Sequence, residues 1–364
     1  MLASLAFRTV LRTGIFLLDY QSAFLGIGIT ALLAANNSLT LPLATLGFGA
    51  LVLAFTTSPL SIDHKPVFWS LFAFCAISTI GAIGAGIWGG GYPSMSFVMA
   101  GFAWYGLLLY CTRPCRRVWE WIVAGLGIHA GLIFVQGVMH YGEHYRAEGF
   151  ADGSTQAAGY LGVAAVYLAT TRRWYLAVPF VMAIPLTGSR LPLIATMGVL
   201  AGLALWKLLR PRHLLILCVC LLLSIVAFWP ATERSILPGS SEGSRIPGDI
   251  GGRFQAPSNG KTLAKEQLTW PGILPQGYAG GKDAHVSLVR LWYEIGAPGL
   301  LSLGMAWTLS FRRLPTTMKW LAVILLGLAS LDFYVIMPPA SLLWWLVISG
   351  RRGRPAPPLP LGRV

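Results

Sequence analysis

Long apolar runs separated by short polar connections follow one another along most of the chain. Runs such as Val67–Ile87, Val118–Met139 and Leu191–Leu209 are long enough, at 1.5 Å per helical residue, to cross a hydrocarbon core of ~30 Å. An apolar helix in a soluble protein would carry charged positions at the helical period. These runs show no such stripes, so the pattern predicts an all-α, polytopic membrane protein.

Twelve runs are predicted to span the membrane, and one long polar stretch separates the first nine from the last three. Residues 1–230 are expected to contain transmembrane helices one to nine, and residues 285–350 helices ten to twelve. Residues 231–284 are expected to form a long loop, and residues 351–364 a disordered tail. The predicted spans are 14–34, 41–57, 67–87, 94–111, 118–139, 156–170, 174–186, 191–209, 213–230, 285–310, 319–333 and 337–349.

The composition agrees with this pattern and limits what the net charge can mean. Hydrophobic residues make up 55% of the chain and charged residues only 11%, against about 25% charged in soluble domains. The net charge of +14 would suit a nucleic-acid partner if it formed one patch, but the basic residues occur in short clusters between apolar runs. That distribution is typical of membrane orientation, so no nucleic-acid partner is expected.

The basic clusters also predict an orientation. Roughly two thirds of the 27 Lys and Arg residues fall in alternate connections of a twelve-span arrangement. The positive-inside rule therefore predicts cytoplasmic termini and an outward-facing 231–284 loop. None of the five cysteines lies in that loop, so no disulfide framework is indicated. No P-loop or dinucleotide-binding glycine motif occurs, and no cofactor is expected.

Several charged residues lie at the predicted outer ends of the helices, where the orientation rule does not account for them. They are Arg146 in an outer loop, Arg190 between two spans, Arg253 in the long loop, and His285 and Arg290 at the start of the tenth span. Guanidinium groups bind phosphate oxygens in bidentate geometry, and a histidine can take a proton from a hydroxyl. Together these residues suit a pyrophosphate held at headgroup depth.

Each of these residues also has a plainer interpretation that the sequence leaves open. Arg190 could be an interfacial cation whose stem lies along apolar surface, and Arg253 a solvated loop charge. Arg290 and Glu294 are four residues apart on one helix face, where they can form an ion pair.

Two weaker features complete the candidates. The segment His140-Tyr-Gly-Glu143-His144 matches a zinc-protease pattern, but it contains a glycine at the end of a helix and has no evident third ligand, so no metal is expected. Asp19 and Asp332 lie within predicted spans, where an acid is either functional or paired with a neighbouring helix.

Three ordered patches resemble the O-antigen ligase and Wzy-type polysaccharide polymerase superfamily of bacterial membrane glycosyltransferases. Residues 146–161 are similar to that family's Arg-x-x-Gly entry into a helix, without its Asn-Pro-Asn, and 187–192 (TGSRLP) to its Ser-Arg-Gly. Residues 284–301 resemble His-Asn-x-x-Leu followed by Glu-x-Gly-x-x-Gly, with Val286 in place of the Asn, and follow a long loop that contains Gly252-Arg253.

The resemblance implies a GT-C-like, inverting and metal-independent transferase in the bacterial inner membrane, with its active site facing the periplasm. The donor would be a glycan on undecaprenyl pyrophosphate. The acceptor would be a lipid A–core in a ligase, or another carrier-linked glycan in a polymerase. Arg190 and Arg253 would hold the pyrophosphate as leaving group, and His285 would orient or deprotonate the acceptor hydroxyl. Arg146 and Arg290 are added to the phosphate site from their place at the outer face.

Two other classes remain alternatives. A flippase or transporter of lipid-linked oligosaccharides would also have about twelve helices, but transporters usually place polar residues at the membrane midplane and show a two-half repeat. A non-catalytic assembly subunit would need no converging Arg and His residues.

Overall fold

The computed structural model describes most of the chain as helices. Every regular element in the described residues is helical, and no strand occurs among them, which confirms the all-α class for this part. The long loop apart from Pro275, the tail, Asp19, Asp332, Arg253 and His285 lie outside the described residues. The structure describes residues 20–35, 40–56, 60–62, 64–88, 93–112, 117–141, 143, 145–151, 153–229, 275, 287–331 and 340–350.

Helical segments fall on all twelve runs that the sequence pattern singled out. Residues Tyr20–Leu33 form the first. The others are α2 (Thr40–Thr56), α3 (Lys65–Trp88), α4 (Pro93–Thr112), α5 (Arg117–Met139), α6 (Ser154–Thr170), the consecutive pieces η1 (Trp174–Ala177), α7 (Val178–Ala183) and η2 (Pro185–Thr187), α8 (Arg190–Leu205), α9 (Pro211–Ala227), α12 (Ser287–Phe311), α13 (Thr316–Leu331) and α14 (Ser341–Ser349).

Two of the predicted runs differ from a regular helix. The run 174–186 is divided into η1, α7 and η2, and Pro179 and Pro185 stand at the starts of the last two pieces. The run is divided at these positions because proline has no backbone N–H to donate the helical hydrogen bond. The run 285–310 is interrupted inside α12 at Gly296, whose φ of 65° and ψ of 179° are not helical. The sequence pattern predicted this span but not the break inside it.

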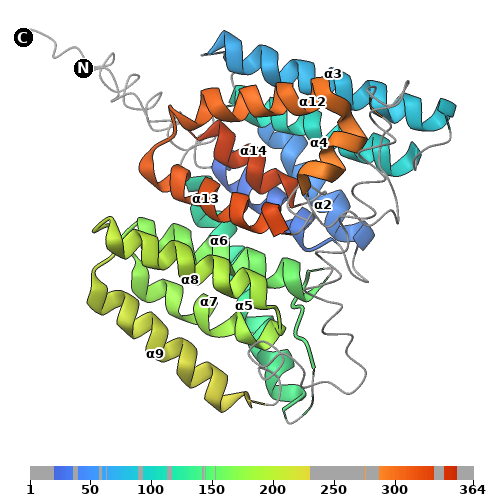
Figure 1. The fold of residues 1–364 in the computed structure, drawn as a ribbon. Coiled ribbons are helices and arrows are strands. Elements are labelled where there is room, and N and C mark those ends of the chain that lie inside the picture. Colours follow the sequence, from blue (N-terminus) through green and yellow to red (C-terminus); the bar gives the residue numbers. More distant parts are fainter. Residues whose placement is uncertain are drawn as a thin grey trace, which may run out of the picture.

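The helices run side by side in two groups (Figure 1). One group holds α5 to α9, and the other holds α2, α3, α4, α12 and α14, while α13 packs on α6 and α8 from one side and on α12 and α14 from the other. In the first group, α6 contacts α5, α7 and α8, and it also contacts α13. It is therefore enclosed, and every residue from Ala157 to Ala169 is buried.

Small side chains allow this enclosure. A Cβ atom at Gly162 would lie 2.3 Å from Thr196 Oγ1 of α8, so only glycine permits the close approach of these two helices. At the far end of α6, the ring of Tyr167 stacks on Trp119 of α5 with the ring centroids 5.6 Å apart. The close packing sets α5 and α8 at fixed positions around α6.

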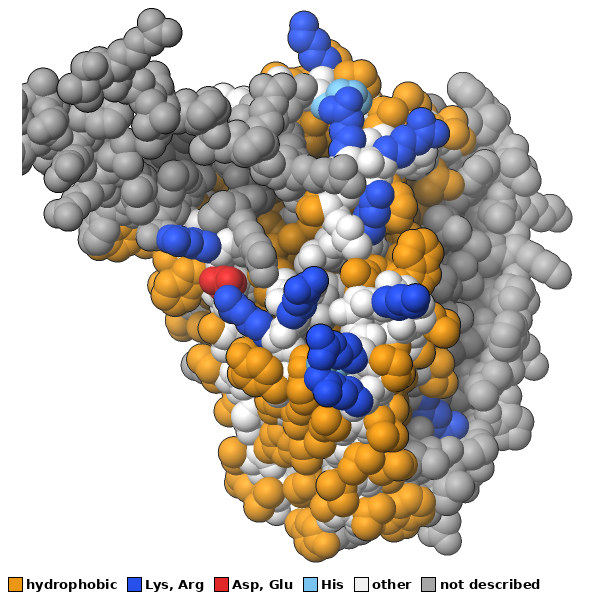
Figure 2. Space-filling model, turned by 90° about the vertical axis from the view of Figure 1, so that its left-hand side faces the viewer, with side chains coloured by type: hydrophobic (Ala, Val, Ile, Leu, Met, Phe, Trp, Pro, Cys, Tyr) orange, Lys and Arg blue, Asp and Glu red, His pale blue; other side chains and the backbone are white. Residues whose placement is uncertain are grey.

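The described connections that are rich in Lys and Arg lie at one end of the assembly. Arg173 Nη2 is 3.3 Å from Glu120 Oε1, which joins the end of α6 to the start of α5. The ring of Trp174 stacks on His213, with centroids 4.2 Å apart, and joins η1 to the start of α9. The turns between α8 and α9 and between α12 and α13 lie at the left of Figure 1, and Figure 2 shows Lys and Arg gathered on that side. Those basic connections that the structure describes thus lie at one end of the helices.

Two of the described helices, Lys65–Ile87 and Arg117–Met139, are long and apolar enough to cross a membrane. Seven shorter apolar helices of 10–17 residues accompany them in the described part of the chain.

The break in α12 predicts a substitution that only glycine tolerates. Gly296→Ala places a side chain in a backbone region that is essentially restricted to glycine. We expect a loss of about 1–3 kcal/mol in stability and a lower unfolding temperature of the purified protein in detergent. Gly304→Ala is the matched control in the same helix, because a Cβ there has open space and alanine favours the helix. Equal unfolding temperatures of the two variants would contradict the assigned break.

Candidate functional site

The segment that carries Arg146 and the turn that carries Arg190 meet at the end of the assembly opposite the basic end. The Ala147 N–H donates a hydrogen bond to the Leu186 carbonyl at 3.1 Å. Beside it, the Arg146 side chain lies against Gly188, where a Cβ atom would be 3.1 Å from Arg146 Cγ. Two of the predicted phosphate-binding arginines, 44 positions apart in the sequence, are therefore brought to one turn.

The turn itself is built by buried hydroxyl groups. The Thr187 hydroxyl donates to the Ile184 carbonyl at 2.7 Å and accepts a hydrogen bond from the Ser189 N–H at 3.3 Å. Gly188 adopts a φ of 65°, in the left-handed region that favours glycine. The Ser189 hydroxyl, in turn, donates to Thr155 Oγ1 at 3.2 Å. These bonds tie the turn to the start of α6.

Arg190 follows directly as the first residue of α8, and its side chain is half-buried. The first N–H groups of a helix have no partner within it, and the helix dipole places partial positive charge there. The arginine therefore adds a full positive charge to a position that already favours an anion. Arg146 is exposed beside it. The arrangement can bind a phosphate or pyrophosphate group.

The backbone of the loop that carries Arg146 is held by hydrogen bonds to the side chain of Gln136 of α5. Gln136 Oε1 accepts hydrogen bonds from the backbone N–H groups of Glu148 at 3.0 Å and Gly149 at 2.8 Å. Its amide nitrogen lies 3.5 Å from the Gly149 carbonyl. One side chain thus engages both backbone groups of Gly149 and fixes the course of the loop.

A fully buried histidine, two helical turns before Gln136 on α5, supports the same loop. His129 Nδ1 accepts a hydrogen bond from the Phe150 N–H at 3.2 Å. The other ring nitrogen therefore carries the proton and donates to the Ala157 carbonyl of α6 at 3.4 Å. A Cβ atom at Gly149, whose φ is 59°, would lie 2.4 Å from His129 Nδ1, so glycine is required there. His129 joins α5, the loop and α6.

Gln136 and His129 were not among the residues predicted from the sequence, and Gly149 was singled out only as the glycine of the Arg-x-x-Gly resemblance. A signal for the first two was present, because polar side chains inside an apolar run are functional or structural candidates by default. Gln156, in the first turn of α6, was also missed. Its Oε1 is buried and has no hydrogen-bond partner in the described part of the chain, which leaves an acceptor beside Thr155.

The other predicted site residues are only partly placed. Arg253 and His285 lie outside the described residues, as does the side chain of Arg290, whose backbone belongs to the first half of α12. The starts of α12 and α8 both lie at the right of Figure 1. Convergence of all five predicted residues remains a prediction. Glu294, which the alternative interpretation pairs with Arg290, is buried with 3% of its surface exposed.

The segment from His140, which matches the zinc-protease pattern, forms contacts with nearby residues. His140 Nδ1 lies 2.8 Å from Glu143 Oε2, and the His140 ring stacks on Tyr145 with centroids 3.9 Å apart. His144 lies outside the described residues. No group of three or more His, Cys, Asp or Glu side chains placed for a metal occurs in the described part of the chain.

Comparison of the chain with known protein families, with curated proteins and with solved structures finds no match.

The support of the Arg146 loop by Gln136 predicts a local change in backbone protection. In Gln136→Leu the side-chain volume is nearly kept, but the acceptor for the Glu148 and Gly149 N–H groups is lost. We expect amide hydrogen exchange in residues 145–151 to become roughly tenfold faster, as the loss of about 1–1.5 kcal/mol implies. Val138→Ala is the control, because Val138 lies on the same helix with 62% of its surface exposed. Unchanged exchange in Gln136→Leu would show that the loop is held otherwise.

Proposed function

We propose that the chain is a multi-pass membrane glycosyltransferase that moves a glycan from undecaprenyl pyrophosphate to an acceptor glycan or a lipid A–core. The observation that carries the proposal is the meeting of Arg146 and Arg190 over one hydrogen-bonded turn, at the end of the helices remote from the basic connections. The resemblance of residues 146–161, 187–192 and 284–301 to the O-antigen ligase and Wzy-type superfamily supports the choice of substrate.

The exposed surface of the helices supports a lipid environment. In the most apolar windows of Lys65–Ile87 and Arg117–Met139, only 44% and 39% of the residues are buried. A core helix of a soluble protein would be mostly buried, whereas here large apolar side chains such as Ile87, Ile128 and Met139 are exposed by 70%, 68% and 74%. Apolar surface of this extent is unfavourable in water and favourable in lipid.

The two ends of the helices differ in a way that supports the proposed orientation. The positive-inside rule assigns the end with the clustered basic connections to the cytoplasm. Arg146 and Arg190 then face the periplasm, together with the long loop that contains Arg253. In this orientation both termini are cytoplasmic, and the donor pyrophosphate lies in the outer headgroup region of the inner membrane.

The proposed reaction is a single displacement at the anomeric carbon of the donor glycan. The acceptor hydroxyl attacks that carbon, the bond to the pyrophosphate oxygen breaks, and the electron pair leaves with undecaprenyl pyrophosphate, so the configuration inverts. Arg190 and Arg253 stabilise the charge that develops on the leaving oxygen, and Arg146 and Arg290 extend the site. His285 accepts the proton of the attacking hydroxyl.

Transfer can be measured as release of undecaprenyl pyrophosphate by the purified full chain, supplied with a carrier-linked oligosaccharide and either acceptor, without ATP. We expect Arg190→Ala to lower the rate by about 10²-fold or more, as loss of one transition-state donor does. Arg190→Lys should recover only part of it, because an ammonium group keeps the charge without the bidentate fork. Arg146→Ala should have a smaller effect.

Arg210→Ala is the matched control, because Arg210 is an exposed arginine at the basic end of the helices. Its activity should equal that of the parent chain. Full activity in both Arg190→Ala and His285→Ala would refute the assigned site. Movement of the intact carrier-linked glycan across a vesicle membrane without release of undecaprenyl pyrophosphate would identify a transporter instead. The acceptor that becomes extended distinguishes ligase from polymerase.

Membrane residence has a separate test. Ile128 lies at the middle of α5 with its side chain exposed by 68%. A lysine at that depth costs about 2.5–3.5 kcal/mol on insertion, so we expect Ile128→Lys to reduce the protein recovered in the membrane fraction. Trp206→Lys, at the end of α8 and exposed by 73%, should be tolerated because its ammonium can reach the headgroups. Recovery of Ile128→Lys in full, as a water-soluble protein, would contradict a lipid-facing α5.

A further inference from the structure

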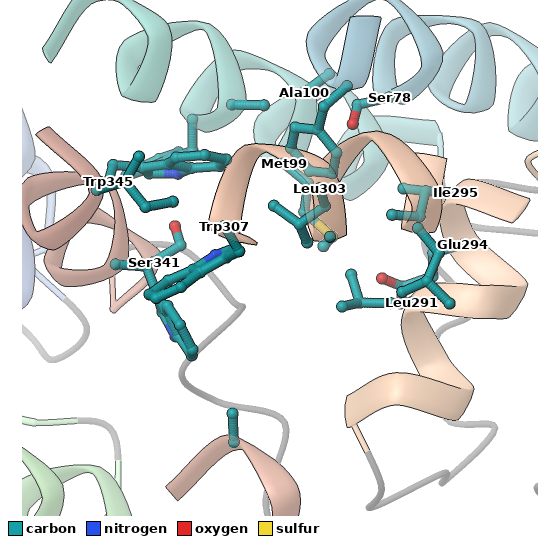
Figure 3. Close-up of a pocket in the computed structure, with 18 of the residues that line it drawn as sticks. Ser78, Met99, Ala100, Leu291, Glu294, Ile295, Leu303, Trp307, Ser341 and Trp345 are labelled. Atoms are coloured by element: carbon teal, nitrogen blue, oxygen red, sulfur yellow. The ribbon is translucent and has the colours of Figure 1, made fainter. Parts of the chain in front are cut away.

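A hollow of about 370 Å³ lies between α3, α4, α12, α13 and α14, within the range of ~300–1,000 Å³ typical of small-molecule sites. We call it the α12 hollow, because the two halves of α12 on either side of Gly296 form much of its wall. Figure 3 shows Leu291, Glu294 and Ile295 on one side of it, Trp307, Ser341 and Trp345 on the other, and Met99 and Leu303 between them. No residue of the Arg146–Arg190 turn lines it.

Two polar groups in the wall have no partner in the described part of the chain. Ser341 Oγ and Trp344 Nε1 are both buried without a hydrogen bond, in side chains exposed by only 6% and 9%. Leaving a buried polar group unpaired costs about 1–3 kcal/mol, so such groups are usually satisfied by water or a ligand. An indole N–H can only donate, so the missing partner must present an acceptor.

The rest of the described wall is unfavourable for an anionic partner. The lining side chains are mostly aliphatic or aromatic, and none of those that the structure describes is a Lys or Arg. Among the lining side chains that the structure describes, a phosphate or pyrophosphate would meet the carboxyl group of Glu294, which is unfavourable for an anion. This chemistry is the opposite of that at Arg146 and Arg190. The α12 hollow therefore fits an apolar chain that carries a neutral acceptor.

The α12 hollow can be reached from the side of the helices. Gly304, Thr308 and Leu326 belong to its wall and are also exposed on the outer surface of α12 and α13. In the membrane location proposed above, that surface faces lipid. An occupant therefore enters sideways from the bilayer.

We propose that the α12 hollow binds one acyl chain of an ester-linked membrane glycerolipid, whose ester carbonyl accepts hydrogen bonds from Trp344 Nε1–H and the Ser341 hydroxyl. An acyl ester supplies the apolar chain and the neutral acceptor together. An isoprenoid chain has no acceptor before its phosphate groups, so the same chemistry disfavours the polyprenyl carrier here. The proposal rests on the membrane location and is independent of the transferase activity.

Photo-crosslinking tests the site with the full chain in nanodiscs. One sample contains phosphatidylcholine with a diazirine in one acyl chain, and a parallel sample contains a diazirine-bearing polyprenyl phosphate. We expect the acyl probe to label peptides 287–311 and 341–349 and the polyprenyl probe to spare them. Leu303→Trp should reduce this labelling at least about tenfold, because the larger indole ring occupies the space that the acyl chain would fill. Leu215→Trp, on the exposed face of α9 (64% exposed), is the matched control and should label as the parent does.

A second variant tests the hydrogen bond without changing the shape of the wall much. Trp344→Phe keeps an aromatic ring but removes the N–H donor, and it should weaken labelling about three- to tenfold, as one hydrogen bond does. Unfolding temperatures of all variants identify any loss of fold. Labelling unaffected by Leu303→Trp, no labelling of the two peptides in a folded parent chain, or preferential labelling by the polyprenyl probe would each overturn the proposal. Labelling lost in Leu303→Trp but unchanged in Trp344→Phe would overturn the ester assignment.

Discussion

Burial of α6 on every side is the constraint on which the arrangement of the other helices depends. Its small residues let α8 approach so closely that Gly162 has no room for a side chain beside Thr196. Packing of this kind, rather than the hydrophobic effect, brings helices together when lipid replaces water as the solvent. The same helix accepts a hydrogen bond from His129 and carries the hydroxyl of Thr155 to the turn at Ser189. The close packing of α6 thereby fixes the position of that turn.

The candidate site uses rigidity that this packing supplies. Arg190 starts a helix packed on α6, and Arg146 lies on a loop whose backbone is held by Gln136 and His129 of α5. Cationic groups that are fixed in advance stabilise developing negative charge without reorganising during the reaction. Two charges on mobile loops would lose that advantage.

The second group of helices contains a different kind of space. The break at Gly296 divides α12 into two halves that both line one largely apolar hollow, in which Ser341 and Trp344 leave two polar atoms unsatisfied. The cationic turn and this neutral hollow lie on different helices. Their chemistries suit different parts of an amphipathic environment, anionic headgroups at the turn and apolar chains in the hollow.

The lengths of the apolar runs by themselves determined where the described helices are. This works because an apolar run must bury its backbone polar groups in its own hydrogen bonds, and a helix does so without any partner. The alternation of basic connections predicted that the described basic turns lie at one end of them. Arg190 and Arg146 were predicted to lie at the same end of the helices from their positions between apolar runs, and the structure places them there. Only the tertiary structure decided that Arg146 crosses Gly188, that Gln136 and His129 hold its loop, and that α12 breaks at Gly296. These features depend on contacts between residues far apart in sequence and on one backbone conformation, and no local pattern records either.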